Sequence, residues 1–322
     1  MIHVKDIEKA YQNIKHDVYK TPMIFSPELS NISGAKVYLK MEQLQHTGSF
    51  KIRGVLNKMY HIDKENFNKP FVAASTGNHA AAFCYASEKH AFRGTLFLPE
   101  KTNESKIKAL ENYKNIEKVF YGKNSMETER KATTYAKEIE GILVHPYNDI
   151  AIISGQGTIG LEIINQLPNV NTILVPIGGG GLISGIASYF KTNDNVDVIG
   201  CQPTNASEMY LSVKQGRIVS PSTLETISDA TAGGIEEDAI TYTICKKLIT
   251  HFELSEEEAI KKAVAFMIKY HQTIIEPAGA LPVSILLNTK KFANKNVVLV
   301  LTGKKINTLL LTEILNSYGN YY

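Results

Sequence analysis

Short apolar runs alternate along the chain with segments whose apolar residues recur at helical spacing. The strand-like runs, each bounded by turn residues, are 71–74, 95–98, 142–144, 172–177, 196–200 and 297–301. The segments with helical spacing are 107–113, 127–139, 160–167 and 256–270. Strands that alternate with helices form parallel sheets covered on both faces. The pattern therefore predicts an α/β fold.

A polar turn at 145–149 separates two blocks of this alternation. The first block runs from about residue 70 to this turn, and the second begins after it. We therefore predict a smaller domain, residues 70–146, inserted in a larger domain made of 1–69 and 147–322. The stretch 212–237, rich in Ser, Thr, Gly and Pro, is the least regular part of the chain. We expect a mobile loop or an interface there.

Composition narrows the class of protein. The 322 residues are 43% hydrophobic, enough for one large or two ordinary domains with their own cores. The net charge is +3 and no dense Lys/Arg cluster occurs, so we expect no nucleic-acid partner. The N-terminus is charged and no apolar run is long enough for a signal peptide or a membrane span.

The cysteines Cys84, Cys201 and Cys245 lie far apart in the sequence, without a C-x-x-C pair. This spacing encodes neither a zinc knuckle nor a disulfide framework. Reduced thiols and the absence of a targeting segment together predict a cytoplasmic protein that does not bind membranes.

Lys51 follows Ser49 and Phe50 at the start of a segment, 51–60, that we expect to be helical. Ser49 is a candidate N-cap, which places Lys51 in the first turn. A lysine there can bind phosphate or form an imine with an aldehyde. A lone lysine is more often an exposed surface residue, so the interpretation depends on the other motifs.

Ser75, Thr76, Gly77, Asn78 and His79 directly follow the strand-like run 71–74. They form a predicted strand-to-helix turn at the carboxyl edge of a parallel sheet, where ligands of such folds bind. Hydroxyl, amide and backbone N–H groups at a helix N-terminus can hold an α-carboxylate. The alternative is an ordinary capped helix start.

Gly178, Gly179, Gly180 and Gly181 lie between the run 172–177 and a helical stretch that begins with Leu182. Four glycines cost about 1 kcal/mol each relative to alanine, so a simple connector explains them poorly. Backbone N–H groups in such a turn bind anions. A reactive lysine, a carboxylate site and a phosphate site together indicate pyridoxal phosphate.

Six motifs in this order resemble those of fold-type-II pyridoxal-phosphate enzymes, specifically the threonine/serine dehydratase and serine racemase family. The resemblance covers nearly the whole chain. The six motifs are Ser49–Gly54, Ser75–His79, Gly155–Thr158, Gly178–Gly181, Glu276–Ala280 and Thr302–Gly303.

The resemblance implies a tryptophan synthase β-like fold of two open, twisted parallel-sheet domains. It implies that Lys51 binds the cofactor covalently and that Phe50 and Asn78 flank its ring. Thr302 is expected opposite the ring nitrogen. The remaining expected cofactor-binding residues are Glu276, Gly178, Gly179, Gly180, Gly181 and Leu182, and the expected substrate-binding residues are Ser75, Thr76, Gly77, Asn78 and His79.

The implied reaction is the dehydration of a small β-hydroxy amino acid. Lys51 removes the Cα proton, the β-hydroxyl leaves, and hydrolysis gives a 2-oxo acid and ammonia. The neutral hydroxyl of Thr302 beside the ring nitrogen favours prompt loss of the β-substituent. L-threonine and L-serine are the expected substrates, and relatives form homodimers or homotetramers.

Thr76 stands where racemases of this group carry a serine that acts as second acid or base. The β-branch of threonine restricts χ1, so racemisation of serine or aspartate is an alternative activity and dehydration the first. The expected catalytic residues are Lys51 and Thr76. A β-replacement synthase is disfavoured by His79, and a catalytically silent subunit stays a further alternative.

Two more departures from the family pattern concern substrate and metal. Lys304 and Lys305 lie beside the expected ring-nitrogen site, so an acidic substrate such as 3-hydroxyaspartate is an alternative. Gln202 replaces the first carboxylate of metal-binding members, which leaves Glu208 alone, so we expect no metal. Because the chain ends at Tyr322, we expect no feedback domain.

Overall fold

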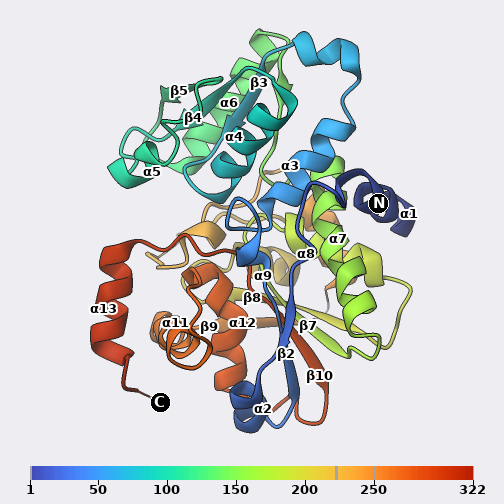
Figure 1. Ribbon diagram of the computed structural model, residues 1–322, viewed down its shortest axis with the longest axis vertical. Helices are drawn as coiled ribbons and strands as arrows, with labels where there is room; N and C mark the ends of the chain where they lie inside the picture. The colour runs from blue at the N-terminus through green and yellow to red at the C-terminus, as the bar shows by residue number, and fades with distance from the viewer. Residues whose placement is uncertain (1, 222–223, 250, 322) are drawn as a thin grey trace.

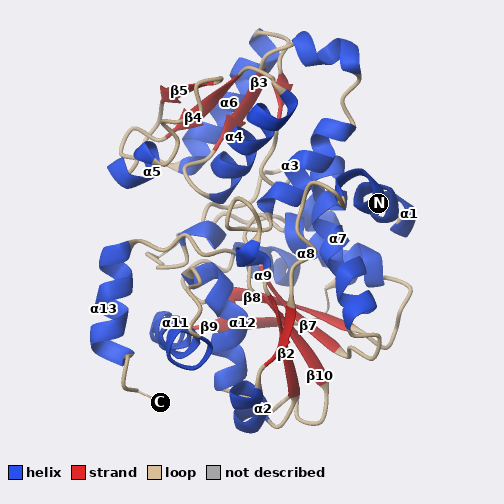
Figure 2. Cartoon of the chain, viewed as in Figure 1, coloured by secondary structure: helices blue, strands red, loops and turns tan. Residues whose placement is uncertain are grey.

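The computed structural model describes residues 2–221, 224–249 and 251–321, and it has two separate sheets (Figures 1 and 2). Helices cover both faces of each sheet, so the predicted α/β class with two parallel-sheet regions is confirmed. Within these residues no helix is long and apolar enough to cross a membrane.

The larger sheet has six strands, and all neighbours are parallel except the first pair. Their order is β1 (Met23–Phe25), β2 (Lys36–Lys40), β10 (Asn296–Val300), β7 (Thr172–Pro176), β8 (Asp197–Pro203) and β9 (Phe252–Ser255). The smaller sheet is wholly parallel. Its order is β5 (Ile116–Phe120), β4 (Gly94–Leu98), β3 (Phe71–Ala74) and β6 (Ile142–Leu143).

The helices connect these strands in crossovers. In chain order they are α1 (Val4–Ile14), α2 (Pro27–Ser33), α3 (Lys51–Tyr60), α4 (Asn78–His90), α5 (Glu104–Lys108), α6 (Ser125–Glu138), α7 (Ile150–Gln166), α8 (Gly181–Phe190), α9 (Glu208–Gln215), α10 (Ile240–Leu248), α11 (Glu257–His271), α12 (Pro277–Leu287) and α13 (Thr308–Tyr318). Short 3-10 turns occur at Glu42–Leu44, Lys64–Asn68 and Asp229–Thr231.

Successive side chains of each central strand point to opposite faces of its sheet and pack in two different hydrophobic cores. On β10, Val297 and Leu299 pack with α11 and α12, whereas Val298 and Val300 pack with α7 and α8. On β3, Phe71 and Ala73 face α3 and α4, whereas Val72 and Ala74 face α6. Both faces of these strands are buried, which explains their nearly continuous apolar sequences.

Helix α3 packs with the smaller sheet's core although it precedes residue 70. Ile52, Val55 and Leu56 belong to the same buried cluster as Phe71 and Leu96. On its other side α3 approaches α7 so closely that a Cβ on Gly155 would lie 2.6 Å from the Arg53 carbonyl. Helix α3 therefore joins the two sheet regions, and the domain boundaries stay a prediction.

A fully buried ionic network fixes the first turn of α3. The Arg53 guanidinium lies 2.8 Å from a Glu42 carboxylate oxygen and 2.7 Å from a Glu162 oxygen, and Lys40 Nζ is 2.5 Å from Glu162. Two positive and two negative side chains balance each other in the interior. Since an unpaired buried charge is strongly destabilising, the four groups hold β2, α3 and α7 in one arrangement.

Two sequence expectations differ from the structure. Strand β1 was not predicted because it has only three residues, and β2, β5 and β9 were not predicted because charged residues interrupt or flank their short apolar runs. The expected helix 107–113 ends at Lys108. Beyond it, Leu110 and Tyr113 donate backbone hydrogen bonds three residues back, so the chain continues as tight turns that still bury Leu110.

Candidate active site

A cavity of about 900 Å³ lies between the two sheet regions. Strand ends, helix starts and the loop after β10 all contribute to its wall. Every residue expected to bind cofactor or substrate, or to act in catalysis, lines it: Phe50, Lys51, Ser75, Thr76, Gly77, Asn78, His79, Gly178, Gly179, Gly180, Gly181, Leu182, Glu276 and Thr302. Motifs far apart in the sequence thus meet at one place.

Lys51 is the first residue of α3, but Ser49 is not its N-cap. The cap is Phe50, which has helical backbone angles, and no side chain caps the helix. Ser49 instead pairs through its backbone with Gly303, and Phe50 N donates to the Thr302 carbonyl at 3.1 Å. The N-cap prediction was therefore wrong, because the loop after β10 holds the helix start.

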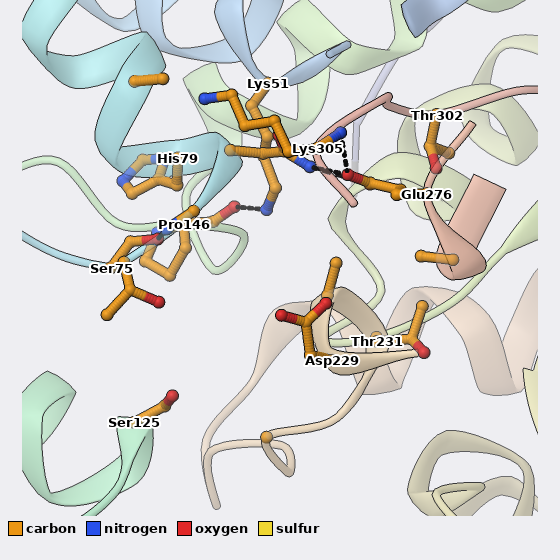
Figure 3. A pocket seen from close by; sticks show the side chains of 18 of the residues that line it. Lys51, Ser75, His79, Ser125, Pro146, Asp229, Thr231, Glu276, Thr302 and Lys305 are labelled. Carbon is orange, nitrogen blue, oxygen red and sulfur yellow. Dashed lines mark hydrogen bonds between the residues drawn. The ribbon is translucent and has the colours of Figure 1, made fainter. Parts of the chain in front are cut away.

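The Lys51 amine points into the cavity and donates a hydrogen bond to the Pro146 carbonyl, 2.7 Å away (Figure 3). Burial lowers its pKa to about 8, although the nearby carboxyl groups of Glu129 and Glu276 act in the opposite direction. About a tenth of the amine is therefore neutral at pH 7, far more than for an ordinary lysine. A neutral amine is the form that acts as nucleophile or base.

The turn 75–79 presents free backbone donors to the cavity. Gly77 caps α4, and the first intrahelical bond is the one from Ala81 N to the Gly77 carbonyl at 3.1 Å. The N–H groups of Asn78, His79 and Ala80 precede that bond and have no carbonyl partner within the helix. Ser75 Oγ accepts from Gly77 N at 3.2 Å and so shapes the turn.

The His79 side chain cannot donate a hydrogen bond to a carboxylate in this arrangement. Its Nε2 lies 2.8 Å from the Val144 carbonyl, which only accepts, so Nε2 carries the proton. Burial lowers the pKa of the ring to about 3, and Nδ1 is left as a buried lone pair. Any contact of His79 with an anion therefore comes from its backbone N–H.

The glycine run forms a second helix start on the opposite sheet. Gly180 caps α8 with φ +87°, a left-handed conformation that favours glycine. A Cβ on Gly179 would lie 2.4 Å from the Tyr147 ring. The first intrahelical bond is that from Ser184 N to the Gly180 carbonyl, so the N–H groups of Gly181 and Leu182 are free for an anion.

Glu276 and Thr302 lie on the side of Lys51 away from Ser75 and His79 (Figure 3), and Asn78 lines the same cavity. Asn78 Nδ2 donates to both Glu276 oxygens at 2.8 and 2.9 Å, and Lys305 N donates to one of them at 3.2 Å. Burial raises the pKa of Glu276 to about 7. Asn78 Oδ1 and Thr302 Oγ1 are buried without a partner among the described residues.

These orphaned atoms fit pyridoxal phosphate. A ring hydroxyl can donate to Asn78 Oδ1, and a pyridine nitrogen can accept from Thr302 Oγ1. The free N–H groups of the glycine run suit the phosphate, and the amine of Lys51 suits the aldehyde. The residues present therefore match each functional group of the cofactor.

Several lining residues were not singled out by the sequence. Pro146 and Tyr147 come from the polar turn that follows β6, and Glu129 comes from α6. The position of that turn, after a strand of a parallel sheet, was the available signal. Part of the irregular stretch 212–237 also lines the cavity, at Asp229 and Thr231 (Figure 3), whereas residues 222 and 223 lie outside the described residues.

The stretch considered for a metal is occupied by its own hydrogen bonds. Gln202 is buried, accepts from Tyr210 N at 2.9 Å and donates to the Ile177 carbonyl at 3.3 Å. Burial raises the pKa of Glu208. Among residues 2–221, 224–249 and 251–321 no cluster of three His, Cys, Asp or Glu side chains could hold a metal ion.

Comparisons with known proteins find similarity over nearly the whole chain. Residues 14–303 match the family model described as pyridoxal-phosphate dependent enzyme. An L-threonine ammonia-lyase of Thermotoga maritima is 36% identical over 317 residues, which cover 98% of this chain and 79% of the relative.

Solved structures show the same fold. Threonine deaminase isoform 2 of Solanum lycopersicum superposes with a TM-score of 0.90 at 29% identity, covering 98% of this chain and 87% of that one. Maize serine racemase has a TM-score of 0.89 at 27% identity, with 98% and 99% covered. The chain belongs to the family of pyridoxal-phosphate dependent enzymes.

Proposed function

We propose that this protein is a pyridoxal-phosphate dependent ammonia-lyase that converts L-threonine, and also L-serine, to a 2-oxo acid and ammonia. One observation carries the proposal. The Lys51 amine, with its pKa lowered to about 8, lies in one cavity with two helix starts that offer backbone donors to anions. The names of the threonine ammonia-lyase and threonine deaminase relatives support this choice.

The cofactor would be held by residues on three sides of the cavity. The Lys51 amine would hold its aldehyde, the amides from Gly178 to Leu182 its phosphate, and Asn78 and Thr302 its ring hydroxyl and nitrogen. Phe50, whose ring centroid is 5.4 Å from Lys51 Nζ, would flank the ring. When bound, pyridoxal phosphate withdraws electrons from Cα and so acidifies its proton.

The chain's own residues then bind the substrate and move the proton. The free N–H groups of Asn78 and His79 hold the α-carboxylate at the start of α4, and Ser75 keeps that turn in shape. Lys51 Nζ, in its neutral form, takes the Cα proton. The Pro146 carbonyl orients this amine through the 2.7 Å hydrogen bond.

A racemase of serine or aspartate is the second candidate. Thr76 lines the cavity, so it offers a hydroxyl, and serine and aspartate racemases are among the similar solved structures. The β-branch restricts its rotation, which favours dehydration as the main activity. Loss of optical rotation without ammonia release would identify a racemase.

Lys51→Ala tests the proposal directly. We expect folding to persist, because alanine suits a helix, and ammonia release from threonine to fall below detection. Lys64→Ala, at an exposed lysine of a 3-10 turn outside the cavity, is the matched control and should retain full activity. Borohydride treatment of the wild type should fix a pyridoxyl group on Lys51. Deamination by Lys51→Ala would refute the assignment.

The remaining expectations are proposals of the same kind. We propose a smaller domain of residues 70–146 in a larger one of 1–69 and 147–322, and the smaller sheet's strands, which lie between Phe71 and Leu143, support this division. The buried free thiols of Cys84, Cys201 and Cys245 support a cytoplasmic location. A homodimer or homotetramer is proposed from the resemblance, with an amino acid as the small-molecule partner.

A further inference from the structure

Glu236 lies outside the cavity lining, but it contacts the turn 145–149 that follows β6. Its carboxylate oxygen Oε2 accepts a hydrogen bond from Asn148 Nδ2 at 3.0 Å and lies 3.0 Å from His145 Nε2. Its backbone N donates to the Tyr147 hydroxyl at 3.2 Å. A residue far along the chain thus contacts three residues of this turn.

The turn 145–149 is also fixed by its own side chains and by the start of α10. Asn148 Oδ1 accepts from Ile240 N, in the first residue of α10, at 2.9 Å. His145 Nδ1 accepts from Tyr147 N and Asn148 N at 3.2 and 2.7 Å. Since Nδ1 accepts, His145 Nε2 carries the ring proton and presents it towards Glu236.

The Glu236 carboxylate is well suited to hold the turn. The adjoining His145 ring keeps the pKa of the Glu236 carboxyl below its ordinary value, although partial burial acts in the opposite direction. The group is therefore ionised at neutral pH. A charged acceptor forms stronger hydrogen bonds than a neutral one, so Glu236 binds the turn more firmly than an uncharged side chain would.

Two residues of the turn act on the candidate active site. The Pro146 carbonyl accepts from Lys51 Nζ at 2.7 Å (Figure 3). The Tyr147 side chain packs on the glycine run, because a Cβ on Gly179 would lie 2.4 Å from its ring and one on Gly181 3.0 Å from its Cβ. A displacement of the turn would therefore disturb both the reactive amine and the expected phosphate site.

We propose that Glu236 is a positioning residue, which holds the turn 145–149 so that the Pro146 carbonyl orients Lys51 and the Tyr147 ring supports the glycine run. The inference rests on the proposed function, because it concerns the same amine and the same cofactor. Glu236 acts through the turn and not on the substrate, since it lies outside the cavity lining.

The test compares the wild type with Glu236→Ala, which removes the acceptor, and with Glu236→Gln, which keeps an oxygen without the charge. The Kd for pyridoxal phosphate is measured by absorbance titration of the cofactor-free proteins. We expect it to rise about tenfold in Glu236→Ala and less than about threefold in Glu236→Gln. Glu237→Ala, at the exposed neighbouring residue, is the matched control and should stay within about twofold of the wild type.

Turnover of L-threonine by the holoenzymes gives a second readout. In Glu236→Ala we expect kcat to fall about three- to tenfold, because the Pro146 carbonyl no longer orients the amine. KM should change by less than about twofold, because the expected carboxylate site is the turn 75–79. A general loosening of the site would move both constants. A rise in KM with unchanged kcat would overturn the proposal.

A third readout does not depend on turnover. Acetic anhydride labels the neutral Lys51 amine, whereas the Pro146 carbonyl accepts a hydrogen bond and so favours the charged form. Cofactor-free Glu236→Ala should therefore be labelled at Lys51 about twofold or more faster than the cofactor-free wild type. Glu236→Gln, which removes the same charge, should be labelled more slowly than Glu236→Ala. Equal labelling of Glu236→Ala and the wild type would overturn the proposal.

Asn148→Ala removes the same contact from the side of the turn. If Glu236→Ala does not fold, Asn148→Ala should show the same weaker cofactor binding and lower kcat, and wild-type values there would contradict the inference. If both fold, Glu236→Ala should raise the Kd at least about twofold less in the Asn148→Ala background than alone, since the two side chains share one contact. Fully independent effects would contradict a shared role.

The outcomes separate this inference from the proposed function. Ammonia release by the wild type, with unchanged Kd, kcat and labelling in Glu236→Ala, would overturn the inference and leave the proposed function intact. A wild type that binds pyridoxal phosphate but releases no ammonia from threonine or serine would refute the proposed function. In that case, weaker cofactor binding and faster labelling of Lys51 in Glu236→Ala would still support Glu236 as a positioning residue.

Discussion

Two walls of the cavity are built in different ways. What we call the backbone wall is a pair of strand-to-helix turns, 75–79 after the smaller sheet's β3 and the glycine run 178–181 after the larger sheet's β7, that expose backbone N–H groups. The other wall consists of side chains from α6, the turn after β6 and the loop near Asp229. The backbone wall suits anions common to cofactor and all amino-acid substrates, so the choice between substrates falls to the side-chain wall.

The largest effect should come from a change in the backbone wall. Gly179→Ala places a Cβ 2.4 Å from the Tyr147 ring, and overpacking of this kind costs about 1–3 kcal/mol. We expect the Kd for pyridoxal phosphate to rise roughly ten- to hundredfold, measured by absorbance titration of the cofactor-free protein.

Gly77→Ala is the control from the other half of the same wall. A Cβ on Gly77 meets no atom within 4 Å, so cofactor affinity should change by less than about threefold. Equal losses in both variants would show that glycine content as such, not the contact with Tyr147, determines cofactor binding.

A smaller effect should follow from removing a side chain that supports the backbone wall. Ser75→Ala deletes the oxygen that accepts from Gly77 N, and a hydrogen bond contributes about 0.5–1.5 kcal/mol. We expect KM for threonine to rise roughly three- to tenfold with a lesser change in kcat. Ser125→Ala, at the start of α6 in the lining of the same cavity (Figure 3), should alter KM by less than about twofold. A larger rise of KM in Ser125→Ala than in Ser75→Ala would contradict the comparison.

The smallest expected effect is a shift in the pH at which the Lys51 amine becomes reactive. Burial lowers the pKa of Lys51 to about 8, so its neutral, reactive form accumulates as pH rises through that value. Labelling of Lys51 in the cofactor-free protein should therefore have its midpoint near pH 8. Because the Glu129 carboxylate favours the charged amine, Glu129→Gln should move the midpoint to lower pH and raise labelling at pH 7 roughly two- to threefold. A shift to higher pH would contradict the assigned sign.

The backbone wall was predictable from the sequence and the side-chain wall was not. Glycines and small polar residues after an apolar run mark a strand-to-helix turn at the ligand-binding edge, and this logic located Gly77 and Gly180. Glu129 carries no such local signal, because a glutamate in a helix is usually solvated. Its place in the cavity lining depends on how α6 packs on the smaller sheet through Ala132 and Ala136.

The hydrogen-bond partners of individual site residues could not be predicted either. The sequence could not show that the His79 ring donates its hydrogen bond to the Val144 carbonyl, or that Ser49 does not cap α3. Both outcomes depend on segments more than 60 residues away, since Val144 follows β6 and the Ser49 backbone pairs with Gly303. Likewise the short edge strand β1 forms only because β2 is available to pair with it.

The shared cluster around α3 has a consequence for dissecting the molecule. Ile52, Val55 and Leu56 complete the core that Phe71 and Leu96 begin, so a fragment cut at residue 70 would expose an apolar face. Such a fragment should aggregate or stay partly unfolded, and it would also lack the reactive amine. The smaller sheet region therefore depends for its folding on α3, the helix that carries Lys51.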